Sequence, residues 1–265
     1  MPRGIIFYYS STGNTELACE YLRRRSSQTE FELHDMKSGK RDDLDAFEIV
    51  GFATFVDYMG PPKFFVDFVK GIRTSGGKPA FVLNTCASIP GRSLKTMSRM
   101  VESSGFEVLS GHTIFMPENL PYMRRRGIRN DGNPKEKEFA SFNSFISDLD
   151  DLATSISLKG EVRKRPLKIG ILNLLIPAFR RTRARKSMGG IWADDPACIE
   201  CGKCVPICPY GAIRMDPKPV FDLSRCYGCY ACYNICPADA IRTKKIQGGH
   251  HYRGPSQDLL RKLSY

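Results

Sequence analysis

Apolar and polar positions alternate in blocks along the first 150 residues of the chain. Apolar runs rich in β-branched and aromatic residues stand at 4–9, 47–55, 80–85 and 106–115. Stretches with helical or amphipathic spacing separate them, at 15–25, 63–72 and 93–105. Continuous apolar strands that alternate with helical patterns are typical of a parallel sheet covered by helices on both faces. The pattern therefore predicts a doubly wound α/β domain.

A longer helical pattern runs from residue 133 to about residue 159. Its apolar positions share one face: Phe142, Phe145, Leu149 and Leu152. This predicts the last helix of the α/β domain. Beyond it, Pro166 and Pro177 interrupt the pattern, and after Trp192 the composition changes to cysteine, proline and glycine. The predicted parts are residues 1–158 as the α/β domain, 159–189 as a linker, 190–247 as a second domain and 248–265 as a tail, in which His250 and His251 are expected to be solvated.

Eight of the ten cysteines lie between residues 198 and 236. The segment 198–214, CIECGKCVPICPYGAIR, repeats as 226–242, CYGCYACYNICPADAIR, with 9 of 17 positions identical. Each half reads C-x2-C-x2-C-x3-C-P, in which the x2 spacings direct three thiolates to one cluster. In two-cluster ferredoxins the fourth cysteine binds the other cluster. The expected ligands are Cys198, Cys201, Cys204 and Cys236 for cluster one, and Cys226, Cys229, Cys232 and Cys208 for cluster two.

This segment resembles the bacterial-type ferredoxins with two [4Fe-4S] clusters, over roughly residues 190–245. The resemblance implies a small α+β domain. The alternative is structural zinc, because C-x2-C pairs also build tetrahedral sites. Zinc would explain two pairs, but it would leave the remaining cysteines, the prolines that follow them and the duplication without a reason.

Residues 8–16, YYSSTGNTE, form a donor-rich turn between the first apolar run and the first helical stretch. The N-terminus of a helix presents unpaired N–H groups, and with Ser and Thr hydroxyls these can surround a phosphate without a cation. The turn resembles the FMN phosphate loop of the flavodoxins, [ST]-x-T-G-x-T, here Ser10, Ser11, Thr12, Gly13, Asn14 and Thr15. The alternative is an ordinary capped turn. Because the loop lacks Lys and Arg, we expect the flavin to have a low reduction potential.

The flavodoxin resemblance also implies that two later loops, at the carboxyl ends of strands, hold the flavin ring. The residues carried over are Thr54, Phe55, Tyr58, Met59 and Gly60 from the first loop, and Thr85, Cys86, Ala87, Ser88 and Gly91 from the second. The chain departs from a familiar form of the family at Ala53, where proline is common, and its first loop has no tryptophan. Cys86 has a second interpretation, as a small buried apolar residue.

The formal net charge is +12, and most of it is local. Residues 159–186 contain ten Lys or Arg and one acid, Glu161, around the apolar stretch IGILNLLIPAF. The apolar stretch is expected to pack between the domains, while its charged flanks are solvated. The alternatives are a membrane surface, which anionic lipids would favour, and an acidic protein partner. Nucleic acid is not expected, because no stacking aromatics lie among the arginines.

Neither a signal peptide nor a spanning helix is visible, and the cysteine pattern suits a reducing compartment, so a cytoplasmic location is expected. As a whole the chain resembles the flavodoxin–ferredoxin fusions of the EFR1-type ferrodoxin family. The resemblance implies FMN, two [4Fe-4S] clusters and redox protein partners, either a ferredoxin-like donor or a reductase acceptor. The leading hypothesis is an electron carrier; the alternatives are a reductase of a small molecule or quinone, and a nucleic-acid or membrane binding module with structural clusters.

Overall fold

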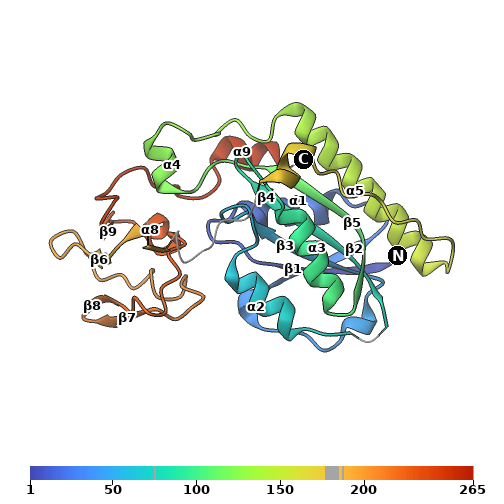
Figure 1. Ribbon diagram of the computed structural model, residues 1–265, viewed down its shortest axis with the longest axis horizontal. Coiled ribbons are helices and arrows are strands. Elements are labelled where there is room, and N and C mark those ends of the chain that lie inside the picture. The colour runs from blue at the N-terminus through green and yellow to red at the C-terminus, as the bar shows by residue number, and fades with distance from the viewer. Residues whose placement is uncertain (75, 177–184, 187, 265) are drawn as a thin grey trace.

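Five parallel strands form the central sheet of the N-terminal part (Figure 1). In the computed structural model, which describes residues 1–74, 76–176, 185, 186 and 188–264, the strands are β1 (Arg3–Tyr8), β2 (Glu30–Asp35), β3 (Ile49–Phe55), β4 (Lys78–Cys86) and β5 (Phe106–Phe115). Their order is β2-β1-β3-β4-β5, the order of flavodoxin-like sheets. The doubly wound α/β prediction is confirmed, but the sequence pattern missed β2.

Helices cover both faces of this sheet. One apolar core joins the sheet to α1 (Asn14–Arg25) and α5 (Glu136–Ser157). A second core joins the opposite face to α2 (Lys63–Gly71) and α3 (Ser93–Ser103). Shorter helical turns stand in the connections: η1 (Met36–Ser38), η2 (Leu44–Ala46) and α4 (Pro121–Arg125).

The cysteine-rich part lies beside the carboxyl ends of the strands (Figure 1). It has two antiparallel pairs, β6 (Ile191–Ala193) with β9 (Ile241–Thr243) and β7 (Ile213–Asp216) with β8 (Lys218–Phe221), and the short helix α8 (Ala231–Ile235). Ile213 and Ile241, at equivalent places in the two sequence repeats, are buried in one common core. The duplicated sequence thus folds into two halves that pack on each other, as the prediction of a small α+β domain requires.

The C-terminal tail returns to the α/β part. Its helix α9 (Gln257–Lys262) places Leu259 and Leu263 in the core shared by α1 and α5, where they are 3% and 0% exposed. The His251 side chain is only 5% exposed and its ring stacks on Tyr233 at a centroid distance of 4.3 Å. The expectation of a solvated tail was therefore wrong for His251, while His250 is exposed.

The basic linker is partly packed and partly exposed. The Arg165 N–H donates to Leu109 O at 2.7 Å, and Ile169 packs against the core under α2 and α3. In α6 (Ile171–Leu175), however, the apolar side chains Ile171, Leu172 and Leu175 are 69–79% exposed. The expectation that this stretch packs between the domains was wrong for these three residues. Pro177, Arg180, Arg181 and Arg183 lie outside the described residues.

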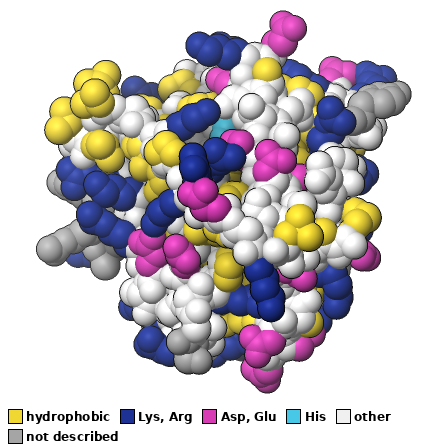
Figure 2. Space-filling model, turned by 90° about the vertical axis from the view of Figure 1, so that its right-hand side faces the viewer, with side chains coloured by type: hydrophobic (Ala, Val, Ile, Leu, Met, Phe, Trp, Pro, Cys, Tyr) yellow, Lys and Arg dark blue, Asp and Glu magenta, His cyan; other side chains and the backbone are white. Residues whose placement is uncertain are grey.

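No helix in the described part of the chain is both long and apolar enough to cross a membrane. On the face turned away from the cysteine-rich part, Lys and Arg side chains are interspersed with Asp and Glu (Figure 2). Among the residues that the structure describes, Lys and Arg form no broad continuous surface in that view.

Two tyrosines of the cysteine-rich part cap the N-terminus of α2. The Lys63 N–H donates to the Tyr227 hydroxyl at 2.8 Å, and the Phe64 N–H donates to the Tyr210 hydroxyl at 3.2 Å. The N-cap residue of this helix, Pro62, provides no side-chain cap. Two of the four N–H groups that a helix leaves unpaired at its N-terminus are thus satisfied from the other part of the chain.

We expect the double substitution Tyr210→Phe with Tyr227→Phe to lower the free energy of unfolding by about 1–3 kcal/mol, because lost helix caps typically cost about 1 kcal/mol each. Urea unfolding followed by circular dichroism measures this. The matched control is Tyr122→Phe, which removes an exposed hydroxyl contacted by Arg126 and should change little. Equal stability of the double variant and the control would show that the caps do not hold the two parts together.

Candidate functional site

The loop between β1 and α1 is a tight turn that hydrogen bonds hold in place. Gly13 has a φ of 92°, in the left-handed region that glycine adopts without strain, and α1 begins at the next residue. The Ser10 Oγ accepts the Gly13 N–H at 3.0 Å, and the Thr12 Oγ accepts from the Asn119 side chain at 2.9 Å. Because each oxygen already accepts a bond from the protein, each hydroxyl proton can be donated to a phosphate. The unpaired N–H groups of the first turn of α1 point to the same place.

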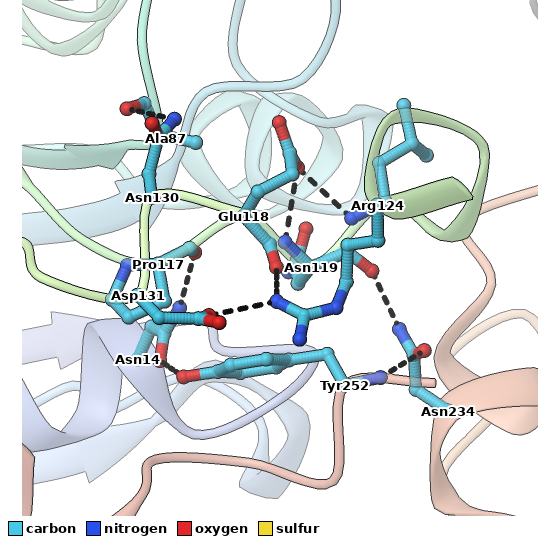
Figure 3. A network of polar contacts seen from close by, with 11 residues as sticks. Asn14, Ala87, Pro117, Glu118, Asn119, Arg124, Asn130, Asp131, Asn234 and Tyr252 are labelled. Carbon is cyan, nitrogen blue, oxygen red and sulfur yellow. Dashed lines mark hydrogen bonds and ion pairs between the residues drawn. The ribbon is translucent and has the colours of Figure 1, made fainter. Parts of the chain in front are cut away.

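Asn14 holds the loop rather than offering its amide to a ligand. Its Nδ2 donates to Pro117 O at 3.0 Å, and its Oδ1 accepts the Tyr252 hydroxyl at 2.5 Å (Figure 3). Thr15 is similarly engaged, because its hydroxyl lies 2.9 Å from that of Thr85 at the end of β4. These residues contribute backbone N–H groups to the site, and their side chains fix its shape.

A cavity of about 270 Å³, referred to below as the large cavity, extends from this loop along the carboxyl ends of the strands. Twelve of the sixteen residues predicted to bind FMN line it: Ser10, Ser11, Thr12, Asn14, Thr15, Phe55, Tyr58, Met59, Thr85, Cys86, Ala87 and Ser88. The structure thus brings together three loops that are far apart in the sequence. Apolar side chains such as Phe55, Met59 and Ile89 suit a planar aromatic ring.

The other four predicted residues, Gly13, Thr54, Gly60 and Gly91, are not among the residues that line this cavity. Thr54 is fully buried and its hydroxyl lies 3.4 Å from Tyr9 O. Gly91 allows the two loops predicted to hold the flavin ring to approach each other, because a Cβ at this position would lie 2.6 Å from the Cβ of Met59. Gly13 shapes the turn of residues 10–15, named the phosphate turn after its predicted ligand. A Cβ at Gly13 would come within 3.0 Å of Pro255. Gly13, Thr54 and Gly91 thus support the shape of the loops and do not line the cavity themselves.

A fourth loop, after β5, also lines the cavity and was missed by the sequence prediction. It contributes Met116, Pro117, Glu118, Asn119, Leu120 and Met123. Figure 3 shows how the loop is held: Arg124 donates to Glu118 O at 2.9 Å and to Asp131 at 3.0 Å, and it lies over the Tyr252 ring. No motif marks these residues; the only signal in the sequence was their place after the last strand of the sheet.

The cavity is acidic. Its described lining residues include two acids, Asp57 and Glu118, and no Lys or Arg. Burial raises the pKa of Glu118, an effect opposed by the backbone N–H groups of Leu120 and Asn119 and by Arg124. Burial raises the pKa of the Cys86 thiol to about 12, with a smaller contribution from Glu118. Cys86 is therefore a neutral thiol in the cavity wall, in agreement with its interpretation as a small buried residue.

Two cations approach the other side of the phosphate turn. A cavity of about 160 Å³ there is lined by Ser10, Gly13, Lys37 and Arg253, among other residues. Both cations are engaged by acids, Lys37 by Asp35 and Arg253 by Asp239. The turn itself contains no cation, as its sequence shows, and the neighbouring ones are neutralised by their partners.

The eight cysteines of the repeats fall into the two predicted sets. One cavity of about 20 Å³ is lined by Cys198, Cys201, Cys204 and Cys236, and another of the same size by Cys208, Cys226, Cys229 and Cys232. Burial, together with the thiols of Cys236, Cys201 and Cys198, raises the pKa of Cys204 to about 11. The fourth cysteine of each repeat thus joins the first three of the other repeat.

Backbone N–H groups also point at sulfur in a symmetric way. The Ala212 N–H donates to Cys208 Sγ at 3.4 Å, and the Ala240 N–H donates to Cys236 Sγ at 3.3 Å. Within the described residues, no group of three His, Cys, Asp or Glu lies close enough together for a single metal ion.

The second cysteine set reaches the large cavity. Gly228 and Cys229 line its wall together with residues of the phosphate turn and the ring loops. Asn234 of α8 strengthens the junction, because its amide donates to Asn119 O at 2.9 Å and accepts the Tyr252 N–H at 3.0 Å (Figure 3). In the first set, by contrast, Cys201 is exposed.

Residues 197–240 match the model of the 4Fe-4S dicluster domain family. This part of the chain is a ferredoxin-type domain with two [4Fe-4S] clusters. No curated protein matches the chain.

Among solved structures, the chain is similar to a flavodoxin from the domain Archaea, with 15% identity, a TM-score of 0.42 and coverage of 57% of this chain and 99% of that one. A Fusobacterium nucleatum flavodoxin bound to flavin mononucleotide has 13% identity, a TM-score of 0.42 and coverage of 57% and 98%. The rubredoxin oxygen:oxidoreductase of Desulfovibrio gigas has 14% identity, a TM-score of 0.42 and coverage of 58% and 37%.

Proposed function

We propose that this protein is an electron carrier that passes single electrons between its two [4Fe-4S] clusters and an FMN in the large cavity, to serve a redox partner. One observation carries the proposal: Cys229, from the second cysteine repeat, lines the same cavity as the phosphate turn. A cluster bound there would lie directly beside the ligand of the α/β domain. FMN supplies a centre that exchanges either one or two electrons, whereas each cluster carries one.

The chain's own residues would hold the FMN as follows. The hydroxyls of Ser10 and Thr12 and the N–H groups at the start of α1 would bind the phosphate. Phe55 and Tyr58 would contact the ring, and the loop that follows β4 would border its polar edge. In this arrangement the cavity wall formed by Gly228 and Cys229 excludes water between the two centres.

The proposed order is cluster one, cluster two, flavin. Cluster two, with Cys226, Cys229, Cys232 and Cys208 as ligands, is the proximal one. Cluster one, with Cys198, Cys201, Cys204 and Cys236, is distal, and the exposure of Cys201 places it where a partner protein can approach. Fusion of the two domains replaces a diffusional encounter by a high effective concentration.

A redox titration of the reconstituted protein, followed by both EPR and visible absorption, tests this function. We expect cluster signals and flavin transitions in the same chain. Cluster signals without any flavin transition would contradict the proposal and favour structural clusters. Turnover of quinones or other small molecules with a low-potential donor would instead identify a reductase.

We expect Ser11→Lys to raise the reduction potential of the flavin. Two unit charges about 8 Å apart interact by about 2 kcal/mol at an effective dielectric constant near 20, before screening by salt. Ser11 is a cleaner position than Asn14, whose amide holds Pro117 and Tyr252. Spectroelectrochemistry at low salt measures the shift. The control is Ser11→Gln, of similar bulk but neutral; if both variants shift the potential equally, charge at the turn does not set it.

A further inference from the structure

Glu118 is placed as a titratable group inside the large cavity. It belongs to the loop after β5, on the wall formed with Cys86, Met116 and Asn119. Its Oε1 accepts the N–H groups of Asn119 and Leu120, both at 2.9 Å. Figure 3 shows the second carboxyl oxygen pointing away from these two bonds. Within the described residues no hydrogen bond is assigned to this Oε2, so it can carry a proton without losing a contact.

The surroundings of Glu118 shift the pKa of its carboxyl upward, because burial outweighs the opposing contacts. The charged or titratable groups near it are Arg124 of α4, Cys86 at the end of β4, Asp57 across the cavity, and Asp131 and Tyr252, which contact Arg124. Arg124 divides its interactions between Asp131, the Glu118 carbonyl and the Tyr252 ring. Burial raises the pKa of the carboxyl, and the N–H groups and Arg124 only oppose this.

Electrons that enter this cavity add negative charge where acids already stand and where no described Lys or Arg lines the wall. A proton must follow them for the charge to be balanced at low cost. We propose that Glu118 is the proton donor of the flavin cavity. The proposal deepens the proposed function and rests on it, since it requires a flavin beside the carboxyl.

In the proposed step Glu118 gives up its proton as the flavin takes up an electron. An electron arrives from cluster two, which an external one-electron donor has reduced. The O–H bond at Glu118 Oε2 breaks and an N–H bond forms at a ring nitrogen. The carboxylate that remains keeps both backbone N–H bonds at Oε1, and water at the mouth of the cavity returns the proton.

Glu118→Gln separates proton donation from support of the loop. The amide oxygen still accepts the N–H groups of Asn119 and Leu120, but the side chain has no acidic proton. In stopped-flow reduction of the holo protein, we expect the flavin to be reduced about 100-fold more slowly at pH 7, the lower end of the range for general acids, with cluster reduction unchanged. In the unsubstituted protein the rate should fall as the pH rises through the pKa of Glu118, since the donor is then lost; in the variant the rate should not follow this titration.

Infrared difference spectroscopy gives a second readout, independent of rate. Reduction of the flavin should produce a carboxylic acid C=O signal that is absent in Glu118→Gln. The matched control is Glu161→Gln, the same chemical change at an exposed carboxyl of the linker. Unchanged rates together with an unchanged infrared difference would overturn the proposal and leave Glu118 as a support of the loop. If the protein bound no flavin, the proposed function and this proposal would both fail, whereas flavin binding with normal rates overturns the proton donor alone.

Discussion

Cys229→Ala should halve the iron content and disconnect the flavin. The substitution removes one ligand of the proximal cluster, so iron should fall from about eight to about four atoms per chain. The rate of flavin reduction would then depend on collisions between the protein and the external donor. A tethered centre acts at an effective concentration near millimolar, so with roughly 10 µM donor the flavin should be reduced roughly 100-fold more slowly. Iron analysis and stopped-flow absorption measure the two effects.

Cys201→Ala is the matched control for this experiment. It removes a ligand of the distal cluster, on the exposed side of the domain. Iron should again fall by half, but cluster two remains beside the cavity and should still reduce the flavin. If the two variants slowed flavin reduction equally, the proposed order of the centres would be wrong. Circular dichroism must show that both variants keep the fold of the protein without substitutions.

Leu263→Ala should be the most destabilising of the tail substitutions. Leu263 is fully buried in the core between the sheet, α1 and α5, beyond the end of α9. Loss of a buried leucine side chain costs about 2–5 kcal/mol, through lost burial and the cavity left behind. The tail also brings Tyr252 to Asn14, so FMN affinity should fall together with stability. Urea unfolding followed by flavin fluorescence measures both.

Leu172→Ala is the control, because this leucine is 78% exposed in α6. Substitutions at exposed positions usually change stability by less than about 0.5 kcal/mol. If Leu263→Ala behaved like Leu172→Ala, the tail would not be part of the folded α/β domain.

Much of the architecture could be predicted from hydrophobic patterning and cysteine spacing. The buried strands β1, β3 and β4 are continuous apolar runs, because helices cover both of their faces. The strand β2 was missed because it lies at the edge of the sheet, where only Phe31 is fully buried and polar residues alternate with apolar ones. The cysteine sets could be foreseen because cluster geometry imposes the spacing.

Long-range contacts explain what the sequence did not reveal. Glu118 and Asn119 are ordinary polar residues, and only the fold places them opposite the phosphate turn. The tail has too few apolar residues for a periodic signal, although Tyr252 and Leu263 are both buried. In the linker, the apolar run of α6 was expected to be covered, yet its side chains face solvent. Asn119, Tyr252 and Leu263 contact residues more than 100 positions away in the sequence, and the α6 side chains are exposed in the described part of the chain.

One chain is proposed to hold both kinds of redox centre. Quantification of iron, zinc and flavin after anaerobic reconstitution of the full chain tests this directly. We expect about eight iron atoms, as two clusters of four, and one FMN per chain. A preparation that holds zinc in place of iron, and no flavin, would contradict it.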